Sequence, residues 1–553
     1  MKKIVFSLFT VFTLIPFIGM SQLSGFAFLA GQTNHSGIKV KFNAHPGTAV
    51  SDSTTTTSTG SYSTSITGGV YDVVFSKAGY LISNYNNGAT IVLTNSVVLN
   101  NDTLKPGNQV NVSGNVCGNW TNNNTYIVTG SITVPTGCTL TIQPGTVIKF
   151  NSNDTLTANG VLIASGTTAN PILFTSNLAT QNIGDWYGIL AHNSSSIIDN
   201  CIIEYCNGMD ATGYNPIISN NVMRNSRSGV YCNNCSPHIF NNKIYNLITP
   251  NGSIGIWVEG TCNAVIECNE LYAFGTWGCG IITNSNLVRN NIIHDINEGI
   301  QSRSSNSRVE NNYLYNCNTG IAVYSTNVPY PVITNNTINS STVGIYVNGS
   351  AGTNASIINN IITNNQDGIS QYGTTLTGYT ISNNLVWNSS SANYNNVQVT
   401  GIGQIVGTNT QGNAIDSYYN MSQDPLFAGG TAPALSSSSP CLNAGDVTYS
   451  NNIGFNTSYT CTANVVAIKT YNKQSNLLVS IYPNPNNGSF VIEPQNTLYN
   501  IHCTVYDVNG KLVLTQTISG KTNIDASSLN EGVYNISIIS NEGVLNNRLV
   551  IVK

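Results

Sequence analysis

A doublet that ends in asparagine recurs nine times along the middle of the chain, and it constrains the fold more than any other feature. Successive copies are 21 to 27 residues apart. The doublets are Asp199-Asn200, Asn220-Asn221, Asn241-Asn242, Cys268-Asn269, Asn290-Asn291, Asn311-Asn312, Asn335-Asn336, Asn359-Asn360 and Asn383-Asn384. A repeat of this length is typical of a solenoid, in which each unit stacks on its neighbours. We therefore expect one elongated repeat domain across residues 106–446.

The residues around the doublet indicate which solenoid forms. A branched aliphatic residue precedes the second member by three positions, beginning with Ile197, and an apolar residue follows it by two, beginning with Ile202. Most repeats then carry a glycine and an apolar residue, as in Gly299-Ile300. Branched residues favour strands, while Asn and Gly tolerate the left-handed backbone of sharp bends. The pattern predicts a parallel β-helix in which residues such as Asn312 form an amide ladder at left-handed turns.

Segments on either side of the repeats resemble those of a known family. Thr139–Ile148 and Gly184–Ile189 resemble the first coils of right-handed β-helix repeat proteins with the pectate-lyase-like fold. Asp424–Phe427 and Ser439–Asp446 resemble the segment that closes such proteins. The resemblance implies a right-handed helix but says little about activity, because folds of this kind carry many functions.

The N-terminal part of the chain carries signs of export. A positive start, an apolar run and small residues predict a secretory signal peptide at residues 1–21. No later stretch is apolar enough to predict a transmembrane segment. Residues 22–105 alternate apolar residues with turns, as a small β-sandwich does. At Gly60-Ser61-Tyr62 and Gly79-Tyr80 they resemble the carboxypeptidase-regulatory-like family, a Cna-B-like sandwich, which implies a spacer or binding module.

Residues 477–553 contain Tyr482-Pro483-Asn484-Pro485, Gly488-Ser489-Phe490 and Leu529-Asn530-Glu531-Gly532-Val533-Tyr534. In these motifs they resemble the type A C-terminal sorting domain of the Bacteroidetes type IX secretion system. The resemblance implies a β-sandwich that is recognised by the secretion translocon and a sortase, and hence a secreted or cell-surface protein. Residues 447–476 are predicted to form a linker. The whole chain is thus expected to be all-β, with a right-handed parallel β-helix solenoid flanked by two small β-sandwich domains. The residues that carry the sorting signal are Pro483, Asn484, Pro485, Gly488, Phe490, Gly510, Gly532 and Tyr534.

Composition narrows the partners and cofactors. Charged residues make up only 8% of the chain and the net charge is -4, which argues against nucleic-acid binding. Thirteen cysteines in an exported chain suggest disulfides, and Cys235 and Cys262 are expected at equivalent places on adjacent coils and hence to pair. Cys232-x-x-Cys235 lacks the second half of a zinc site, so no metal or other cofactor is predicted.

Catalytic motifs are sparse. Glycoside hydrolases need paired carboxylates and pectate lyases need clustered acidic calcium ligands, and neither arrangement is evident in the sequence. The densest polar group in the solenoid is formed by His294, Asp295, Glu298 and Arg303, which are the weak candidates for catalysis. Charges that align on successive coils, such as Glu267 with Arg289, are more simply explained as cross-strand ion pairs.

One column of planar side chains suggests a ligand-binding surface. Alignment by the doublet places four rings pointing outward on consecutive coils beside a cation, and a shorter pair on another column. Sugars dock their apolar faces on such rings, although tyrosines on a pleated surface also simply pack on each other. The candidate ligand-binding residues are Arg224, Tyr245, Tyr272, His294 and Tyr315, with Tyr231 and Trp257 as the second pair.

Two functions are consistent with these features. The first is a secreted or surface-displayed scaffold that recognises polysaccharide or another surface, as an adhesin does. The second is a carbohydrate-active enzyme, of the polysaccharide lyase or epimerase kind, that acts on an acidic glycan. The missing acidic and calcium-binding clusters favour the first.

Overall fold

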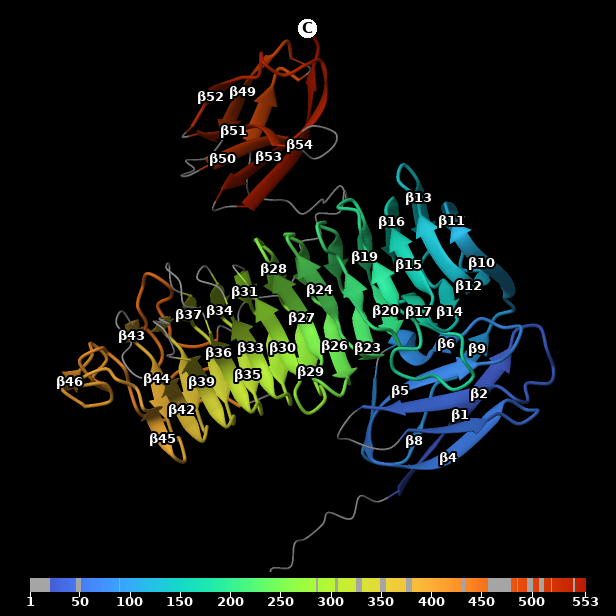
Figure 1. Cartoon of the computed structure of the whole chain (residues 1–553), viewed down its shortest axis with the longest axis horizontal. Helices are drawn as coiled ribbons and strands as arrows, with labels where there is room; N and C mark the ends of the chain where they lie inside the picture. The colour runs from blue at the N-terminus through green and yellow to red at the C-terminus, as the bar shows by residue number, and fades with distance from the viewer. Residues whose placement is uncertain are drawn as a thin grey trace, which may run out of the picture. The chain divides into compact units, whose positions relative to one another are not determined.

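The computed structural model shows an all-β chain dominated by a parallel β-helix (Figure 1). The chain divides into two compact units, Met1–Ala463 and Asn464–Lys553. The described residues are 20–45, 51–88, 90–284, 287–303, 307–324, 331–348, 355–373, 380–429, 433–455, 479–484, 486–494, 501–506, 512–518, 520–540 and 543–553. Most of the predicted signal peptide, residues 1–19, therefore lies outside them, and strand β1 begins at Met20.

The solenoid runs from β10 (Asn108–Asn115) to β45 (Ala392–Asn395), and each regular coil contributes one strand to each of three faces. Strands after the doublet form the first face, among them β20 (Cys201–Glu204), β23 (Val222–Ser226), β26 (Lys243–Leu247), β29 (Glu270–Tyr272), β32 (Ile292–His294) and β35 (Tyr313–Tyr315). The next strands form the second face, among them β18 (Gly188–Leu190), β21 (Met209–Asp210), β24 (Val230–Asn233), β27 (Ile254–Glu259), β30 (Cys279–Thr283), β33 (Glu298–Ser302) and β36 (Thr319–Val323). Strands before the doublet form the third, among them β22 (Ile217–Ser219), β25 (His238–Phe240), β28 (Val265–Glu267) and β31 (Leu287–Arg289).

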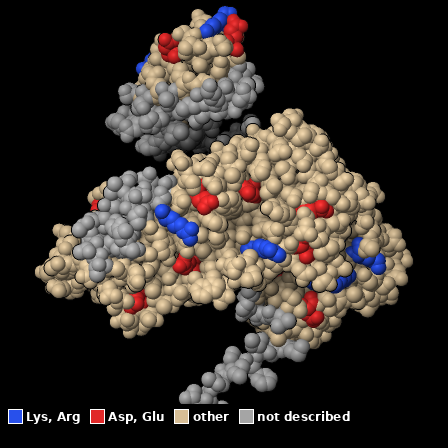
Figure 2. Space-filling view, viewed as in Figure 1, with Lys and Arg blue, Asp and Glu red and all other residues tan. Residues whose placement is uncertain are grey.

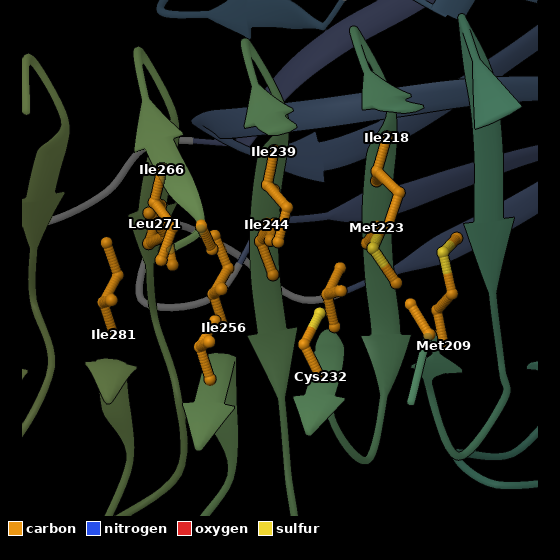
Figure 3. Close-up of a cluster of buried hydrophobic side chains, with 14 of the residues drawn as sticks. Met209, Ile218, Met223, Cys232, Ile239, Ile244, Ile256, Ile266, Leu271 and Ile281 are labelled. Atoms are coloured by element: carbon orange, nitrogen blue, oxygen red, sulfur yellow. The ribbon is translucent and has the colours of Figure 1, made fainter. Parts of the chain in front are cut away.

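Apolar side chains at equivalent positions of successive coils fill the interior. Ile218, Ile239 and Ile266 stack along one line, and Met223, Ile244 and Leu271 along another (Figure 3). The outside carries few charges, as the face drawn in Figure 2 shows. Because charged side chains are so sparse outside and aliphatic ones so regular inside, burial of apolar surface holds the coils together.

The two members of each doublet have different structural tasks. The first member adopts a left-handed backbone, with a φ of 54° at Asn311. The second is buried, and its amide donates to the next coil: Nδ2 of Asn312 lies 2.9 Å from Oδ1 of Asn336. The ladder is therefore confirmed, but the prediction that Asn312 itself occupies the left-handed turn is wrong. The ladder joins Asn221, Asn242, Asn269, Asn291, Asn312, Asn336, Asn360, Asn384 and Asn420.

The first repeat was aligned one residue out of register. Asn200 is the left-handed residue there, and Cys201 takes the place of the ladder asparagine, donating its backbone N–H to Oδ1 of Asn221. Ile198 rather than Ile197 consequently pairs with Ile218, and Ile203 rather than Ile202 with Met223. A shift of one residue exchanges the inner and outer faces of a strand, so it matters for the outward residues of 197–204.

The repeated glycines serve close packing, not the left-handed bends expected of them. None of Gly299, Gly320 and Gly344 has a positive φ. A Cβ atom placed on Gly299 would lie only 2.4 Å from the carbonyl oxygen of Gly320, and one on Gly320 only 2.6 Å from that of Gly344. Glycine is needed because the second face begins where the backbones of successive coils stack too closely for a side chain.

A two-sheet sandwich precedes the solenoid and belongs to the same compact unit. One sheet contains β1 (Met20–Leu29), β4 (Ser61–Thr67), β8 (Val97–Val98) and β9 (Asp102–Leu104). The other contains β2 (Lys39–Ala44), β3 (Asp52–Thr55), β5 (Gly69–Ser76), β6 (Ser83–Asn84) and β7 (Ile91–Leu93). The sandwich form is as expected, and its resemblance to the carboxypeptidase-regulatory-like family stays a prediction.

The closing segment extends further than expected. Ile453 is fully buried, and the carbonyl oxygen of Asn452 accepts a hydrogen bond of 2.9 Å from Nδ2 of Asn335. Residues 447–455 thus pack on the solenoid, although they were predicted to begin the linker. The remaining linker residues, 456–476, lie outside the described residues.

The C-terminal unit is a separate β-sandwich. Its sheets contain β48 (Val479–Tyr482), β49 (Ser489–Pro494) and β52 (Thr522–Asp525), and β51 (Leu512–Ile518), β50 (Ile501–Tyr506), β53 (Gly532–Ser540) and β54 (Gly543–Ile551). Phe490 is fully buried, Tyr534 donates from its hydroxyl to the carbonyl of Asn530, and Oδ1 of Asn484 accepts from the Val550 N–H. Pro485 and Gly510 of the predicted signal lie outside the described residues.

The cysteines are mostly buried thiols. Cys117 and Cys138 form a disulfide with a Cα–Cα distance of 5.9 Å. Cys235 and Cys262, predicted to pair, are adjacent: the Cys235 N–H donates to Sγ of Cys262 at 3.2 Å. Both are free thiols in this structure, so the bridge between them stays a prediction.

Candidate functional site

The predicted column of rings forms a continuous stack on the first face. The ring centroids of Tyr245 and Tyr272 are 5.0 Å apart, those of Tyr272 and His294 4.8 Å, and those of His294 and Tyr315 4.5 Å. The planes are within 11° of parallel. Parallel strands in register place these rings one coil apart, at the distance that favours stacking.

Two of the four rings and the neighbouring Arg224 are not open to solvent, contrary to the expectation for an outward column. Tyr245 is 3% exposed, Tyr272 is 9% exposed and Arg224 is 2% exposed. The N-terminal sandwich covers them: the ring of His45 stacks on Tyr245 at 4.6 Å, and Nδ1 of His45 is hydrogen-bonded to the Tyr272 hydroxyl at 3.0 Å. Three of the candidate ligand-binding residues are therefore part of an interdomain contact.

Charges reinforce that contact. Arg224 donates from Nη1 to Asp72 of the sandwich and from Nε to Oε2 of Glu204, the latter at 2.8 Å. The Tyr245 hydroxyl donates to Oδ2 of Asp72 at 2.8 Å. Burial raises the pKa of Asp72, but the Arg224 charge and hydrogen bonds from His45 and Tyr245 outweigh burial and lower the pKa to about 2. Asp72 is therefore a buried carboxylate that is held ionised by its partners.

The candidate catalytic residues do not form one site. His294 ends a first-face strand, and its Nδ1 lies 2.7 Å from Oδ2 of Asp295, a left-handed turn residue with a φ of 52°. Glu298 and Arg303 lie after the bend, at the second face, where Gln301 contacts both of them. The bend separates the two pairs, so the four residues do not converge on one substrate position.

The pKa values of two carboxyl groups, Glu270 and Glu298, shift in opposite directions. The contact with His294, whose Nε2 lies 3.7 Å from Oε1 of Glu270, and the charge of Lys243 lower the pKa of Glu270 to about 2, against the effect of burial. A carboxyl with so low a pKa stays ionised and cannot serve as a general acid. Burial raises the pKa of Glu298, but its Oε1 accepts from the Tyr324 hydroxyl at 3.3 Å within the second face. The expected ion pair of Arg289 with Glu267 is present at 2.7 Å, and Lys243 forms a second ion pair with Glu270 at 3.0 Å.

The second predicted pair of rings lies in a groove on the second face. Tyr231 and Trp257 pair directly across β24 and β27, and their rings meet edge to face with centroids 5.2 Å apart. The groove has a volume of about 340 Å³. Its lining residues are Tyr187, Leu190, Asn207, Gly208, Met209, Asp210, Ser228, Gly229, Val230, Tyr231, Ile254 and Trp257. Three aromatic rings, aliphatic side chains and a few polar groups are the usual composition of a small-ligand site.

Two polar atoms of the described residues that line the groove are buried without a partner. Among the residues that the structure describes, the buried Oδ1 of Asn207 and Nε1 of Trp257 have no hydrogen-bond partner. Buried polar atoms normally have partners, so one acceptor and one donor without them call for an explanation. A larger hollow of about 530 Å³, around Asn316 and Ser341, is lined by amides and hydroxyls with no aromatic ring.

Sequence reasoning identified Tyr231 and Trp257 but missed their neighbours Tyr187, Asn207 and Asp210. Asp210 pairs directly with Tyr231, one coil earlier in the same outward column. Alignment at the ladder position does not place it there, because Asp210 follows Cys201 by nine residues whereas Tyr231 follows Asn221 by ten. Tyr187 is 53% exposed. It precedes the regular repeats, so the alignment of equivalent positions in successive repeats does not include it.

Metal and membrane-spanning features are absent from the described parts of the chain. Within those residues, no group of three or more His, Cys, Asp or Glu side chains could hold a metal ion. Nor does any helix there have the length and apolarity to cross a bilayer.

Comparison with known proteins identifies two parts of the chain. Residues 228–386 match a right-handed β-helix region, and residues 114–201 match a pectate-lyase-like β-helix domain. Residues 480–552 match a secretion system C-terminal sorting domain. A domain of this kind directs export by the type IX secretion system to the cell surface or beyond.

Solved structures with distant similarity are tailspike proteins of E. coli bacteriophage HK620. One variant has 12% identity and a TM-score of 0.31, and the match covers 76% of this chain and 85% of that chain. Another, in complex with a pentasaccharide, has 11% identity and a TM-score of 0.26, with coverage of 76% and 86%. A search of curated proteins gave no match. By its family matches and its coils, the chain is a right-handed parallel β-helix protein that carries a type IX secretion sorting domain.

Proposed function

We propose that this exported β-helix is a recognition scaffold that binds polysaccharide in the groove of the second face. The observation that carries the proposal is the pairing of Tyr231 with Trp257 beside the two unpartnered atoms of the groove. Aromatic planes accept the C–H faces of a sugar ring, while an amide oxygen and an indole N–H orient its hydroxyls.

The direction of the groove also suits a chain of sugars. Asp210, Tyr231 and Trp257 belong to one column that follows the solenoid axis, one coil apart. Adjacent coils are about 4.8 Å apart, so an extended glycan that lies along the axis contacts several of them in succession. The first-face stack is a poorer platform because Tyr245 and Tyr272 are covered.

Replacement of Trp257 by alanine is expected to weaken glycan binding by about 1–3 kcal/mol, or roughly 5- to 150-fold. The physical reason is the loss of one ring face and of the indole donor at the centre of the groove. Binding is measured by calorimetry on glycans selected from an array, with folded fractions matched beforehand.

Tyr372→Ala is the matched control, because this tyrosine is 64% exposed, lies on β42 (Asp367–Tyr372) and does not line the groove. It should leave affinity unchanged. Equal affinity of wild type and Trp257→Ala for every bound glycan would place recognition elsewhere on the chain.

A further inference from the structure

Carboxylates surround the paired rings of the groove. Asp210 lines it directly, beside Tyr231 in register. The Tyr231 hydroxyl donates to Oε1 of Glu259, and Nδ2 of Asn233 donates to the same oxygen at 3.3 Å. Burial raises the pKa of Tyr231, and the hydrogen bond to Glu259 and the charges of Glu259 and Asp210 raise it further. The groove is thus a site of negative potential.

No cation balances these charges within the groove. Among the described residues that line it, none is lysine or arginine. Arg227 precedes the lining residue Ser228, and its side chain lies against Gly184, which Oδ1 of Asn207 also approaches. Arg227 is exposed and is not among the lining residues, so solvent screens its charge. A bound carboxylate would therefore meet Asp210 with nothing in the lining to neutralise either of them, and like charges brought together on binding lower affinity.

The unpartnered atoms impose the same preference. Oδ1 of Asn207 needs a donor, and Nε1 of Trp257 needs an acceptor. A sugar hydroxyl serves as either, whereas an ionised carboxylate that takes the place of a primary hydroxyl beside Asn207 can only accept and cannot satisfy Oδ1 of that residue. A ligand rich in hydroxyls completes both bonds.

We infer that the groove selects uncharged sugar units and discriminates against uronic acids. This inference rests on the proposed polysaccharide binding and specifies its substrate class. It also runs against the acidic-glycan enzyme suggested by the sequence, because that function needs cationic or metal groups that the lining residues do not supply.

The test uses matched pairs of ligands that differ only in charge. Short gluco-, manno- and galacto-oligosaccharides are compared by calorimetry with the same oligosaccharides oxidised at the primary hydroxyl to uronic acids. The full-length exported protein is expected to bind the neutral member of at least one pair about tenfold or more tightly than its oxidised partner. This difference in affinity should shrink as salt is added, because salt screens the repulsion between the ligand carboxylate and Asp210.

Two variants identify the cause. Asp210→Asn keeps the acceptor oxygen that receives the Thr212 N–H at 2.7 Å but removes the charge. It is expected to reduce the difference in affinity between the neutral and the oxidised ligand to about threefold or less, because the oxidised ligand no longer meets a like charge. Glu259→Gln should act in the same direction to a smaller extent. Tyr372→Ala is again the control for changes unrelated to the groove.

The possible outcomes distinguish a failure of this inference from a failure of the proposed polysaccharide binding on which it rests. Equal or tighter binding of the oxidised member in the preferred pair overturns the neutral preference but leaves polysaccharide binding standing. An affinity difference that persists in both Asp210→Asn and Glu259→Gln also overturns the neutral preference, because the two carboxylates would then not be its cause. Absence of binding to any member of any pair overturns the proposed function itself.

Discussion

Asn312→Val is expected to lower the free energy of unfolding of the solenoid by about 3–5 kcal/mol, since several buried polar groups lose partners that are each worth about 1–3 kcal/mol. Oδ1 of Asn312 accepts from both the backbone N–H and Nδ2 of Asn291, at 3.0 and 2.9 Å. Its own Nδ2 donates to Asn336 and to the carbonyls of Val288 and Glu310. Valine has neither group, and the site is closed to water.

Substitutions of the neighbouring Asn311 separate the ladder from the turn. Asn311→Gly should cost under about 1 kcal/mol, because glycine accepts a φ of 54°, while Asn311→Val should cost about 1–2 kcal/mol from backbone strain. Asn312→Gly should be nearly as harmful as Asn312→Val, because the loss there is one of hydrogen bonds. Denaturant midpoints and hydrogen exchange on adjacent coils measure these differences. A midpoint for Asn312→Val equal to that of Asn311→Gly would contradict the ladder argument.

The solenoid could be predicted from the sequence because the interactions that shape each coil are local and recur from coil to coil. Branched residues at fixed distances from a doublet determine which side chains face inward, and nine copies make the period unmistakable. What the pattern did not separate was the task of each doublet member, since both are usually asparagine. The first repeat, in which Asn200 is followed by Cys201, was misaligned for the same reason: the ladder position there holds no asparagine.

Exposure of the outward columns could not be read from the pattern. Alternation along a strand shows that Tyr245 points out of the solenoid, but not whether it meets water or another domain. Its partner Asp72 is 173 residues away in sequence, and no repeat encodes that distance. One sequence signal was available: Arg224 is an outward cation beside a row of rings, in a chain with 8% charged residues. Such an isolated charge needs a partner when it is buried.

Arg224→Met is expected to destabilise the docking of the N-terminal sandwich by about 3–5 kcal/mol, the scale for a buried ion pair that loses one member. The substitution keeps much of the side-chain volume but leaves Asp72 and Glu204 facing an apolar group. Hydrogen exchange across β26 and β29, together with denaturant unfolding, reports the change. Arg308→Met is the surface control: Arg308 pairs with Glu310 at 2.6 Å but is exposed, so its loss should cost under about 1 kcal/mol.

The pH dependence of this loss distinguishes an electrostatic contact from lost packing. In the wild type the pKa of Asp72 is lowered from 3.8 to about 2, so its contribution is present above about pH 4 and is lost as the pH falls towards 2. Without Arg224, the effect of burial dominates and raises the pKa of Asp72. The stability of Arg224→Met relative to wild type should therefore rise as the pH falls and Asp72 becomes protonated. The difference in stability between wild type and Arg224→Met should therefore be largest near neutral pH and shrink on acidification. Adding Asp72→Asn and Glu204→Gln to Arg224→Met should recover much of the loss at neutral pH, whereas a loss independent of pH would show that Arg224 acts only by filling space.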